Sequence, residues 1–197
     1  MIFSIYNDHK KYAYIGFDWK QIVQEFGESM DTRFDVNCEA KPYSAIWKNP
    51  IKVNFSDNSE GMTGTGIPEI AEHQGRLFLS QKAYEILRDL LEKDGEFLPV
   101  EYENGQGFIF NPLSLAEAVD GIDNKLSVKN EWGEVENIAF HNDKVKNLQI
   151  FKSNFDAHYN VFCQESVKNA VEKSGLKGVI FTPDLGNNLG IYGNETN

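Results

Sequence analysis

Hydrophobic and polar positions follow the same order twice along this chain. From Leu77, a short apolar run leads to a polar break at Gln81, a helical pattern of apolar positions, a glycine and a second apolar run. From Val161 the order recurs, with Gln164 at the polar break. In each stretch the apolar spacing changes from a continuous run to three- and four-residue steps and back. Each therefore predicts a strand, an amphipathic helix and a return strand.

The first unit has a clear helix start and a broad apolar face. Residues 77–79 predict a buried strand, and Ser80 is a favourable N-cap because its hydroxyl can accept a hydrogen bond from a free helix N–H. The helix is predicted to end at Asp94-Gly95, and EFLPVEY follows as the return strand. The stripe that must pack on another element comprises Tyr84, Ile86, Leu87, Leu90 and Leu91.

The second unit repeats these features with two differences. Aligned with the first unit, it has Cys163 in place of the capping Ser80. Gly175 is the predicted helix stop, so Gly178, which aligns nominally with Gly95, has a different role. Two copies are fewer than the three that a solenoid needs, so we expect two strand-helix-strand units sharing one sheet. The apolar stripe of this helix comprises Val167, Ala170 and Val171.

The N-terminal third predicts short strands and one helix. MIFSIY and KYAYIGF have the apolar and aromatic character of strands, and Asp18 is placed to cap a helix through WKQIVQEFG. KPYSAIWKNPIKVNF reads as extended segments, and SDNSEGMTGTGIPE as a loop suited to a hinge. The apolar positions of the helix are Ile22, Val23 and Phe26, with Gly27 near its end.

Further strands are predicted between the two units, at residues 108–110, 135–140 and 148–151. Strands and helices interleave without strict alternation, which predicts an α+β fold with a mixed β-sheet and packed helices. We expect residues 1–66 to form an N-terminal strand and helix elaboration of the same domain. Residues 67–197 form the predicted core, which ends in a short polar tail.

Composition and charge narrow the functional classes. Of the 197 residues, 41% are apolar, which is enough for a real core. A net charge of −11 argues against nucleic-acid binding, which needs a basic surface; it suits a basic protein partner and is equally well explained by solubility. The apolar run in MIFSIYNDHKKY is too short for a signal peptide, no stretch has the length of a membrane span, and two cysteines indicate no disulfide framework. We therefore expect a cytoplasmic protein.

Candidate chemistry is sparse. Cys163 could act as a nucleophile with His158 or His141 as its base, since a helix N-terminus lowers a thiol pKa; a buried, inert cysteine is the more common case. The four histidines lack the spacing of a helical zinc pair. GMTGTG lacks the Lys-Ser/Thr of a phosphate-binding P-loop and reads as a flexible loop. We therefore assign no catalytic, cofactor-binding or metal-binding residue.

Two acidic runs, at residues 89–103 and 117–136, are the remaining surface signal. A solvated face is the default explanation for both. In the second run a tryptophan lies among carboxylates, which is also the composition of an interface hot spot for a basic partner. The candidate partner-binding residues are Asp120, Asp123, Glu131, Trp132, Glu134 and Glu136.

Several of these stretches resemble, in order and spacing, a domain-of-unknown-function family described as immunity proteins of bacterial polymorphic toxin systems. They are LFLSQKAYEILRDLL, GEFLPVEY, FIFNPLSLAEAVDGID, NLQIFK and VFCQESVKNAVEKSGLKGVIFTP, and they extend over residues 67–183. The shared motifs are the serine-capped helix, Asp123 followed by Ser127, and the closing GLKGVIF. Cys163 departs from the pattern, because such proteins often carry a serine there.

The resemblance implies function by binding rather than by catalysis. An immunity protein occludes a cognate toxin domain stoichiometrically, and a cytoplasmic target together with charge complementarity favours a basic, nuclease-like toxin. The resemblance implies no cofactor. Two alternatives remain: a small cysteine-dependent hydrolase or transferase, and a non-catalytic regulator that binds a peptide.

Overall fold

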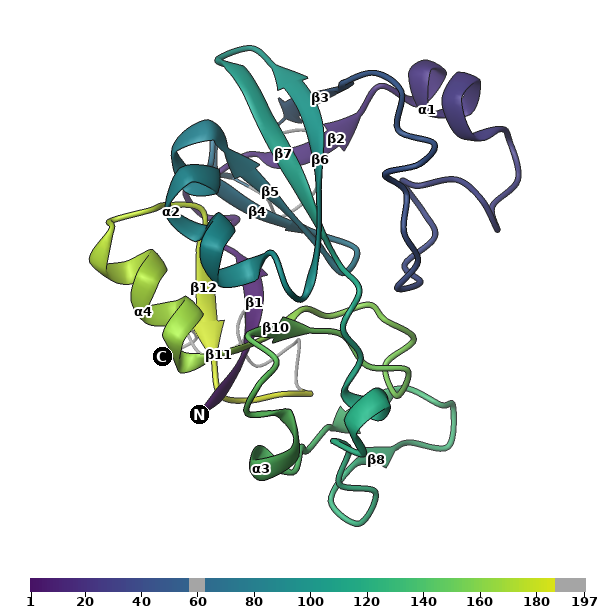
Figure 1. Ribbon diagram of the computed structural model, residues 1–197, viewed down its shortest axis with the longest axis vertical. Helices are drawn as coiled ribbons and strands as arrows, with labels where there is room; N and C mark the ends of the chain where they lie inside the picture. Colours follow the sequence, from purple (N-terminus) through teal and green to yellow (C-terminus); the bar gives the residue numbers. More distant parts are fainter. Residues whose placement is uncertain (57–62, 187–197) are drawn as a thin grey trace.

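The computed structural model describes residues 1–56 and 63–186, and it arranges their strands in two main sheets and one small one (Figure 1). The 6-stranded sheet has the order β2 (Tyr14–Phe17), β3 (Ile51–Ser56), β6 (Gly95–Tyr102), β7 (Gly105–Pro112), β5 (Arg76–Ser80) and β4 (Ile70–His73). The 4-stranded sheet has the order β10 (Ile150–Phe151), β11 (Phe162–Gln164), β1 (Ile2–Asn7) and β12 (Val179–Thr182). The 2-stranded sheet is the hairpin of β8 (Val128–Lys129) and β9 (Val135–Asn137).

Helices cover these sheets at several points. They are α1 (Trp19–Phe26), α2 (Gln81–Leu91), α3 (Asn142–Val145) and α4 (Glu165–Lys173), with a 3-10 turn η1 (Ala116–Val119). The two edge strands of the 6-stranded sheet, β2 and β4, also come into contact, so that this sheet is nearly closed. Parallel and antiparallel pairs occur together, and the predicted α+β class with mixed sheet is confirmed. Within the described residues, no helix is both long and apolar enough to cross a membrane.

In the sheet, the two strands of each strand-helix-strand unit are separated by a third strand that pairs with both of them. In the first unit, β5 and β6 both pair antiparallel with β7, which lies between them. In the second unit, β11 and β12 both pair antiparallel with β1. The two similar stretches of sequence therefore adopt the same strand arrangement. The prediction that both units share one sheet is wrong, because the first lies in the 6-stranded sheet and the second in the 4-stranded sheet.

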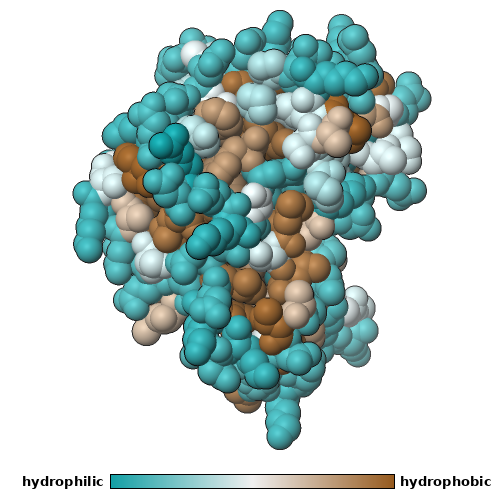
Figure 2. Space-filling model, viewed as in Figure 1, coloured by the Kyte–Doolittle hydropathy of each residue, from teal (hydrophilic) through white to brown (hydrophobic). Residues whose placement is uncertain are grey.

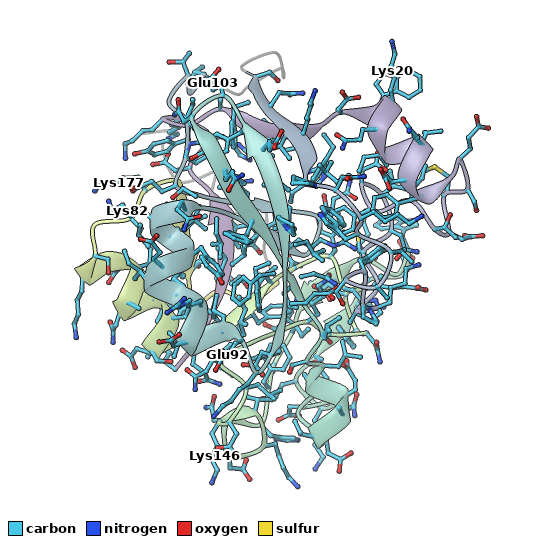
Figure 3. All side chains as sticks on the ribbon, turned by 45° about the horizontal axis from the view of Figure 1, so that its top comes forward. Lys20, Lys82, Glu92, Glu103, Lys146 and Lys177 are labelled. Atoms are coloured by element: carbon cyan, nitrogen blue, oxygen red, sulfur yellow. The ribbon has the colours of Figure 1, made fainter. Side chains whose placement is uncertain are left out.

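The two units face each other through their helices. α2 and α4 pack against each other at one edge of the molecule (Figure 1), each also contacting strands of its own sheet, and their apolar stripes enter one core cluster. At the rim of this contact the Glu69 carboxylate accepts hydrogen bonds from Lys82 Nζ (2.7 Å) and from the backbone N–H of Lys177 (2.9 Å). Figure 3 shows Lys82 and Lys177 on the same side of the molecule. Glu69 thus links the α2 region to the turn that precedes β12.

Local chemistry sets the boundaries of α2. Ser80 is the N-cap, and its hydroxyl accepts a hydrogen bond from the N–H of Ala83 at 3.2 Å. Ile86 is 37% exposed and lies outside the buried stripe. The helix ends before Asp94-Gly95, so the predicted stop is wrong. Gly95 instead opens β6, where a Cβ atom would lie 2.4 Å from the carbonyl oxygen of Asn111 on β7.

The start of α4 differs from the alignment of the two units by one residue. Its N-cap is Gln164, whose side chain donates to the carbonyl of Val145 (2.9 Å) and makes no cap bond. Cys163 lies one position earlier, inside β11, and does not cap the helix. At the other end Gly175 adopts φ 66° just after the helix, as predicted. Gly178 has φ 122°, and its role is indeed different because it lies against the backbone of β4.

The N-terminal strands belong to both large sheets. β1 lies in the middle of the 4-stranded sheet, whereas β2 and β3 extend the 6-stranded one. Asp18 caps α1 as predicted, accepting hydrogen bonds from Lys20 N (3.0 Å) and Gln21 N (3.2 Å). Of the predicted hinge loop, residues 57–62 lie outside the described part of the chain, and so do residues 187–197 of the polar tail. A second core of aromatic rings packs beneath α1: Phe26, Phe34, Tyr43 and Trp47.

The segment between the two units is only partly extended. The strand at 108–110 is confirmed as part of β7. The expected strand at 135–140 is shorter, since β9 ends at Asn137 and Phe140 forms an isolated bridge with Ile122. The strand at 148–151 reduces to β10. This region packs on its own third core, and it forms the lower part of the molecule in Figure 1.

Candidate partner-binding surface

In the first acidic run, two of the carboxylates are structural. Asp94 is 4% exposed, and its carboxylate accepts hydrogen bonds from Ser114 Oγ (2.8 Å) and from the N–H groups of Gln149 (2.7 Å) and Ile150 (3.3 Å). These partners belong to the end of β7 and the start of β10. Asp94 therefore joins the two large sheets, and the default interpretation of a solvated face is wrong for this residue.

Glu96 has a similar role on the other side of β6. Its Oε1 accepts from Tyr43 N (2.6 Å) and Asn111 Nδ2 (2.8 Å), and its Oε2 accepts from Ser44 N (3.0 Å). The carboxylate thereby fixes the loop that carries Tyr43 and Trp47 into the aromatic core. In the second acidic run, by contrast, Glu131, Glu134 and Glu136 are exposed.

The Asp123 and Ser127 pair of the resemblance closes a turn. The Asp123 carboxylate accepts from the N–H groups of Lys125 (3.0 Å) and Leu126 (3.3 Å). Ser127 Oγ accepts from Ala139 N at 3.0 Å, which ties the turn to the strand region beyond β9. Asp123 is thus the least available of the six candidate residues, because its carboxylate is half-buried in its own turn.

The tip of the β8–β9 hairpin presents Trp132 on an ordered turn. Asn130 Oδ1 accepts from Trp132 N (3.0 Å) and Glu134 N (2.9 Å), and Asn130 Nδ2 donates to Glu134 Oε2 (2.7 Å). Gly133 completes the turn with φ 83°. Trp132 is 78% exposed, and Glu131 beside it is also exposed. An aromatic side chain held in solvent by a fixed backbone is a ready anchor for a protein partner.

A hollow of about 910 Å³ lies beside this hairpin, and we call it the hairpin hollow. Its main lining side chains are Lys129, Glu134 and Glu136 from the hairpin and Phe155, Asp156 and Tyr159 from the segment opposite. Figure 2 shows the molecular outline indented on the side between the α1 region above and the β8 region below. The structure thus brings two of the candidate acids, Glu134 and Glu136, to the rim of one concave site.

Asp156 is the residue of this hollow that sequence analysis missed. Its Oδ2 accepts from Asn160 N (2.9 Å) and Asn160 Nδ2 (2.8 Å), whereas its buried Oδ1 has no hydrogen-bond partner in the described part of the chain. Burial raises the pKa of the Asp156 carboxyl to about 6, helped by the charge of Glu117. Ala157 and His158 form this turn at φ 55° and 65°, a conformation that neither residue type signals.

Asp120 lies in a second, smaller hollow of about 370 Å³ beside η1. Asp120 is the C-cap of η1 with φ 52°, and Phe155 lines both this hollow and the hairpin hollow. Glu117 also lines the smaller hollow and accepts hydrogen bonds from Ser153 Oγ (2.6 Å) and Asn154 N (2.9 Å). Three of the candidate acids, Asp120, Glu134 and Glu136, thus line two hollows that share Phe155.

Two buried cations, Arg76 and Lys152, contact the loop between α1 and β3. Arg76 is 1% exposed, donates to Asn111 Oδ1 (3.1 Å) and lies 4.1 Å from the centre of the Phe34 ring. Lys152 Nζ donates to the carbonyl of Cys38 at 3.1 Å, and burial lowers the pKa of Lys152 to about 7, with Arg76 adding to the effect. Both residues anchor the loop between α1 and β3 to the body of the protein.

Cys163 has the surroundings of an inert core residue. It is fully buried in the cluster between α2 and α4, and burial raises the pKa of its thiol far above the ordinary value. His158 Nε2 lies 2.5 Å from Asn154 Oδ1, and His141 Nδ1 lies 3.8 Å from Asp123 Oδ2, so each ring has a partner other than the thiol. The hypothesis of an activated Cys163 nucleophile is therefore wrong. Across residues 1–56 and 63–186, no metal-binding group of three or more side chains occurs.

The comparisons with known proteins identify the family. Residues 19–184 match the model of an immunity protein family, Imm11. The match covers most of the chain, from the first residue of α1 past the end of β12, and the chain belongs to this family. The expected membership of an immunity protein family is confirmed, and the match begins at Trp19, further toward the N-terminus than the stretches over residues 67–183 that carried the resemblance. No curated protein matches the chain by sequence.

Proposed function

We propose that this chain is an immunity protein that binds a cognate toxin domain and blocks it stoichiometrically, without turnover. Membership of the immunity family supports the proposal. The observation that carries the choice of surface is the exposed Trp132 on its ordered, acidic hairpin beside the hairpin hollow. The encounter is proposed to take place in the cytoplasm, where the toxin would act on the cell's own components.

The charge of the surface supports a basic partner. The chain has a net charge of −11, and Glu131, Glu134 and Glu136 are all exposed on the hairpin around Trp132. Opposite charge on a toxin would accelerate the encounter and orient the toxin, whereas Trp132, which would become buried on binding, would supply affinity. A nuclease-like toxin has the basic surface that this arrangement requires.

Binding to the toxin domain encoded beside this chain tests the proposal. For the purified pair, we expect a Kd on the order of 1 nM or tighter, as in other inhibitor complexes of standard interface size. Trp132→Ala should weaken binding about 30-fold, the effect of losing a hot-spot side chain. Trp19→Ala is the matched control, because Trp19 is 62% exposed on α1, at the far end of the molecule from the hairpin (Figure 1).

A charge-reversal variant separates the effect of the surface charge on the association rate from the effect of Trp132 on the affinity. Glu131→Lys combined with Glu134→Lys should lower the association rate most strongly at low salt, since surface charges act at long range only when screening is weak. The same double change leaves the buried core untouched, so the melting temperature should stay near that of the wild type. If the Trp132 variant and the charge-reversal variant both bind the toxin as tightly as the wild type does, the toxin binds to another face.

A further inference from the structure

We propose that the hairpin hollow receives an arginine side chain of the toxin, with the Asp156 carboxylate as its acceptor and the Phe155 and Tyr159 rings as its flanks. This inference rests on the proposed function and names the chemistry of the contact. The hollow is open and polar on one side and aromatic on the other. Its charge, its rings and its unpaired acceptor point to the same occupant.

The Asp156 carboxylate offers a hydrogen-bond acceptor for the arginine. Asp156 Oδ2 accepts two hydrogen bonds from Asn160, which fix the plane of the carboxylate. Its Oδ1 is buried and has no partner among the described residues, although a buried acceptor without a hydrogen bond is costly. A donor brought by a partner would remove that cost. Asp156 lines the hollow, and we infer that its carboxylate turns toward a donor there, because Oδ1 is buried in the free protein.

The sign of the occupant's charge is the second argument. Three carboxylates line the hollow, on Glu134, Glu136 and Asp156, against the single ammonium of Lys129. Lys129 Nζ already lies 5.0 Å from the centre of the Phe155 ring. The chain's own lysine therefore makes, at the rim, the cation–π contact that a partner's cation would make. An anionic occupant would face three like charges.

Arginine fits better than lysine. A guanidinium is flat and weakly hydrated, and it can stack on aromatic rings while its five N–H donors reach a carboxylate in the same plane. Phe155 and Tyr159 supply the rings, and Tyr159 is 54% exposed and so open to contact. A lysine ammonium would use one acceptor and leave these faces unmatched. The hollow is large enough to admit the side chain with its flanking backbone.

Three variants of this chain, measured against the purified toxin domain, test the inference. Asp156→Asn should weaken binding at least tenfold, because the amide places a donor where the guanidinium also donates. Lys129→Met should strengthen binding about threefold, because it removes a competing cation from the Phe155 ring. Glu103→Gln is the charge-matched control on the β6–β7 turn, far from the hollow (Figure 3), and should leave the Kd unchanged.

Asp156→Asn could weaken binding by perturbing the turn at Asn160, and two controls distinguish this effect from loss of the arginine contact. A melting curve checks the fold, and Tyr159→Ala, at an exposed ring, should also weaken binding several-fold. Alanine scanning of the toxin's surface arginines should then find one whose loss is not additive with Asp156→Asn. A Lys129→Met variant that binds more weakly would indicate an anionic occupant and overturn the inference.

Failure of the inference is distinguishable from failure of the proposed function. Unchanged affinity in the Asp156, Tyr159 and Lys129 variants, with Trp132→Ala still weakening binding, would refute the arginine site and leave toxin binding standing. Absence of binding by the wild-type chain would refute the proposed function itself.

Discussion

Asp94→Ala should be among the most destabilising single changes in this protein. The carboxylate accepts hydrogen bonds from Ser114 Oγ and from the N–H groups of Gln149 and Ile150, and its own backbone carbonyl accepts from Leu113 and Ser114. Alanine would leave three donors at a buried junction without their charged acceptor. Hydrogen bonds to charged groups contribute about 1.5–3 kcal/mol each, and they are not additive where water can enter.

The expected loss in the free energy of unfolding is about 3–5 kcal/mol. A typical domain has about 5–15 kcal/mol in total, so the variant should unfold at a much lower denaturant concentration. Asp89→Ala is the matched control from the same acidic run, because the Asp89 side chain is 85% exposed and pairs with the neighbouring Arg88 at 3.2 Å. It should cost no more than about 0.5 kcal/mol.

Urea denaturation followed by tryptophan fluorescence and by circular dichroism measures both variants. Without Asp94 the two large sheets should separate more easily, so both probes should shift together to a lower midpoint. Should Asp94→Ala and Asp89→Ala lose stability to the same small extent, the role of Asp94 as the link between the sheets would be refuted.

Three further predictions follow from buried or strained positions. Cys163→Ala should cost about 1 kcal/mol and leave toxin protection intact; a folded variant without protection would restore the case for cysteine chemistry. Burial lowers the pKa of His73 to about 4, so stability should fall by up to about 3 kcal/mol as the pH drops from 6.5 to 4, and His73→Gln should lessen that slope. Gly178→Ala puts a Cβ atom 2.0 Å from the Ile70 carbonyl oxygen, so it should destabilise far more than Gly105→Ala, which has a similar φ and open space; equal melting temperatures would contradict this.

Sequence patterns predicted what local chemistry determines. Asp18 and Ser80 cap their helices, and Gly175 ends α4, because each of these residues acts within one turn of its own position. The two amphipathic helices were also evident, since their apolar spacing is continuous along the chain. The starts of α1 and α2 and the existence of the two units therefore needed no knowledge of the fold.

Strand partners were not predictable in the same way. β7 enters the first unit from the residues that follow it, and β1 enters the second from the other end of the chain. Such pairings depend on contacts distant in sequence, and a strand's apolar pattern does not name its neighbour. The one-residue displacement of the α4 cap has a similar origin, because pairing with Phe3 and Ile150 keeps Cys163 inside β11.

The candidate surface could be predicted from the sequence only in part. Composition located the second acidic run and Trp132, but it could not separate Glu131 in solvent from Asp94 and Glu96 in structural hydrogen bonds. A carboxylate's role depends on which N–H groups approach it, and these come from distant segments. Asp156 had no signal at all, because the hollow that it lines exists only once the hairpin and the 155–160 turn are brought together.

A titration of toxin activity with the purified chain tests the central claim most directly. The toxin domain is held at a concentration far above the Kd, and its activity is measured as this chain is added. We predict a linear fall to zero at one chain per toxin, since each bound molecule covers one toxin and nothing is consumed. Full toxin activity in the presence of excess chain would contradict the account, and so would complete loss of activity at a small fraction of one equivalent.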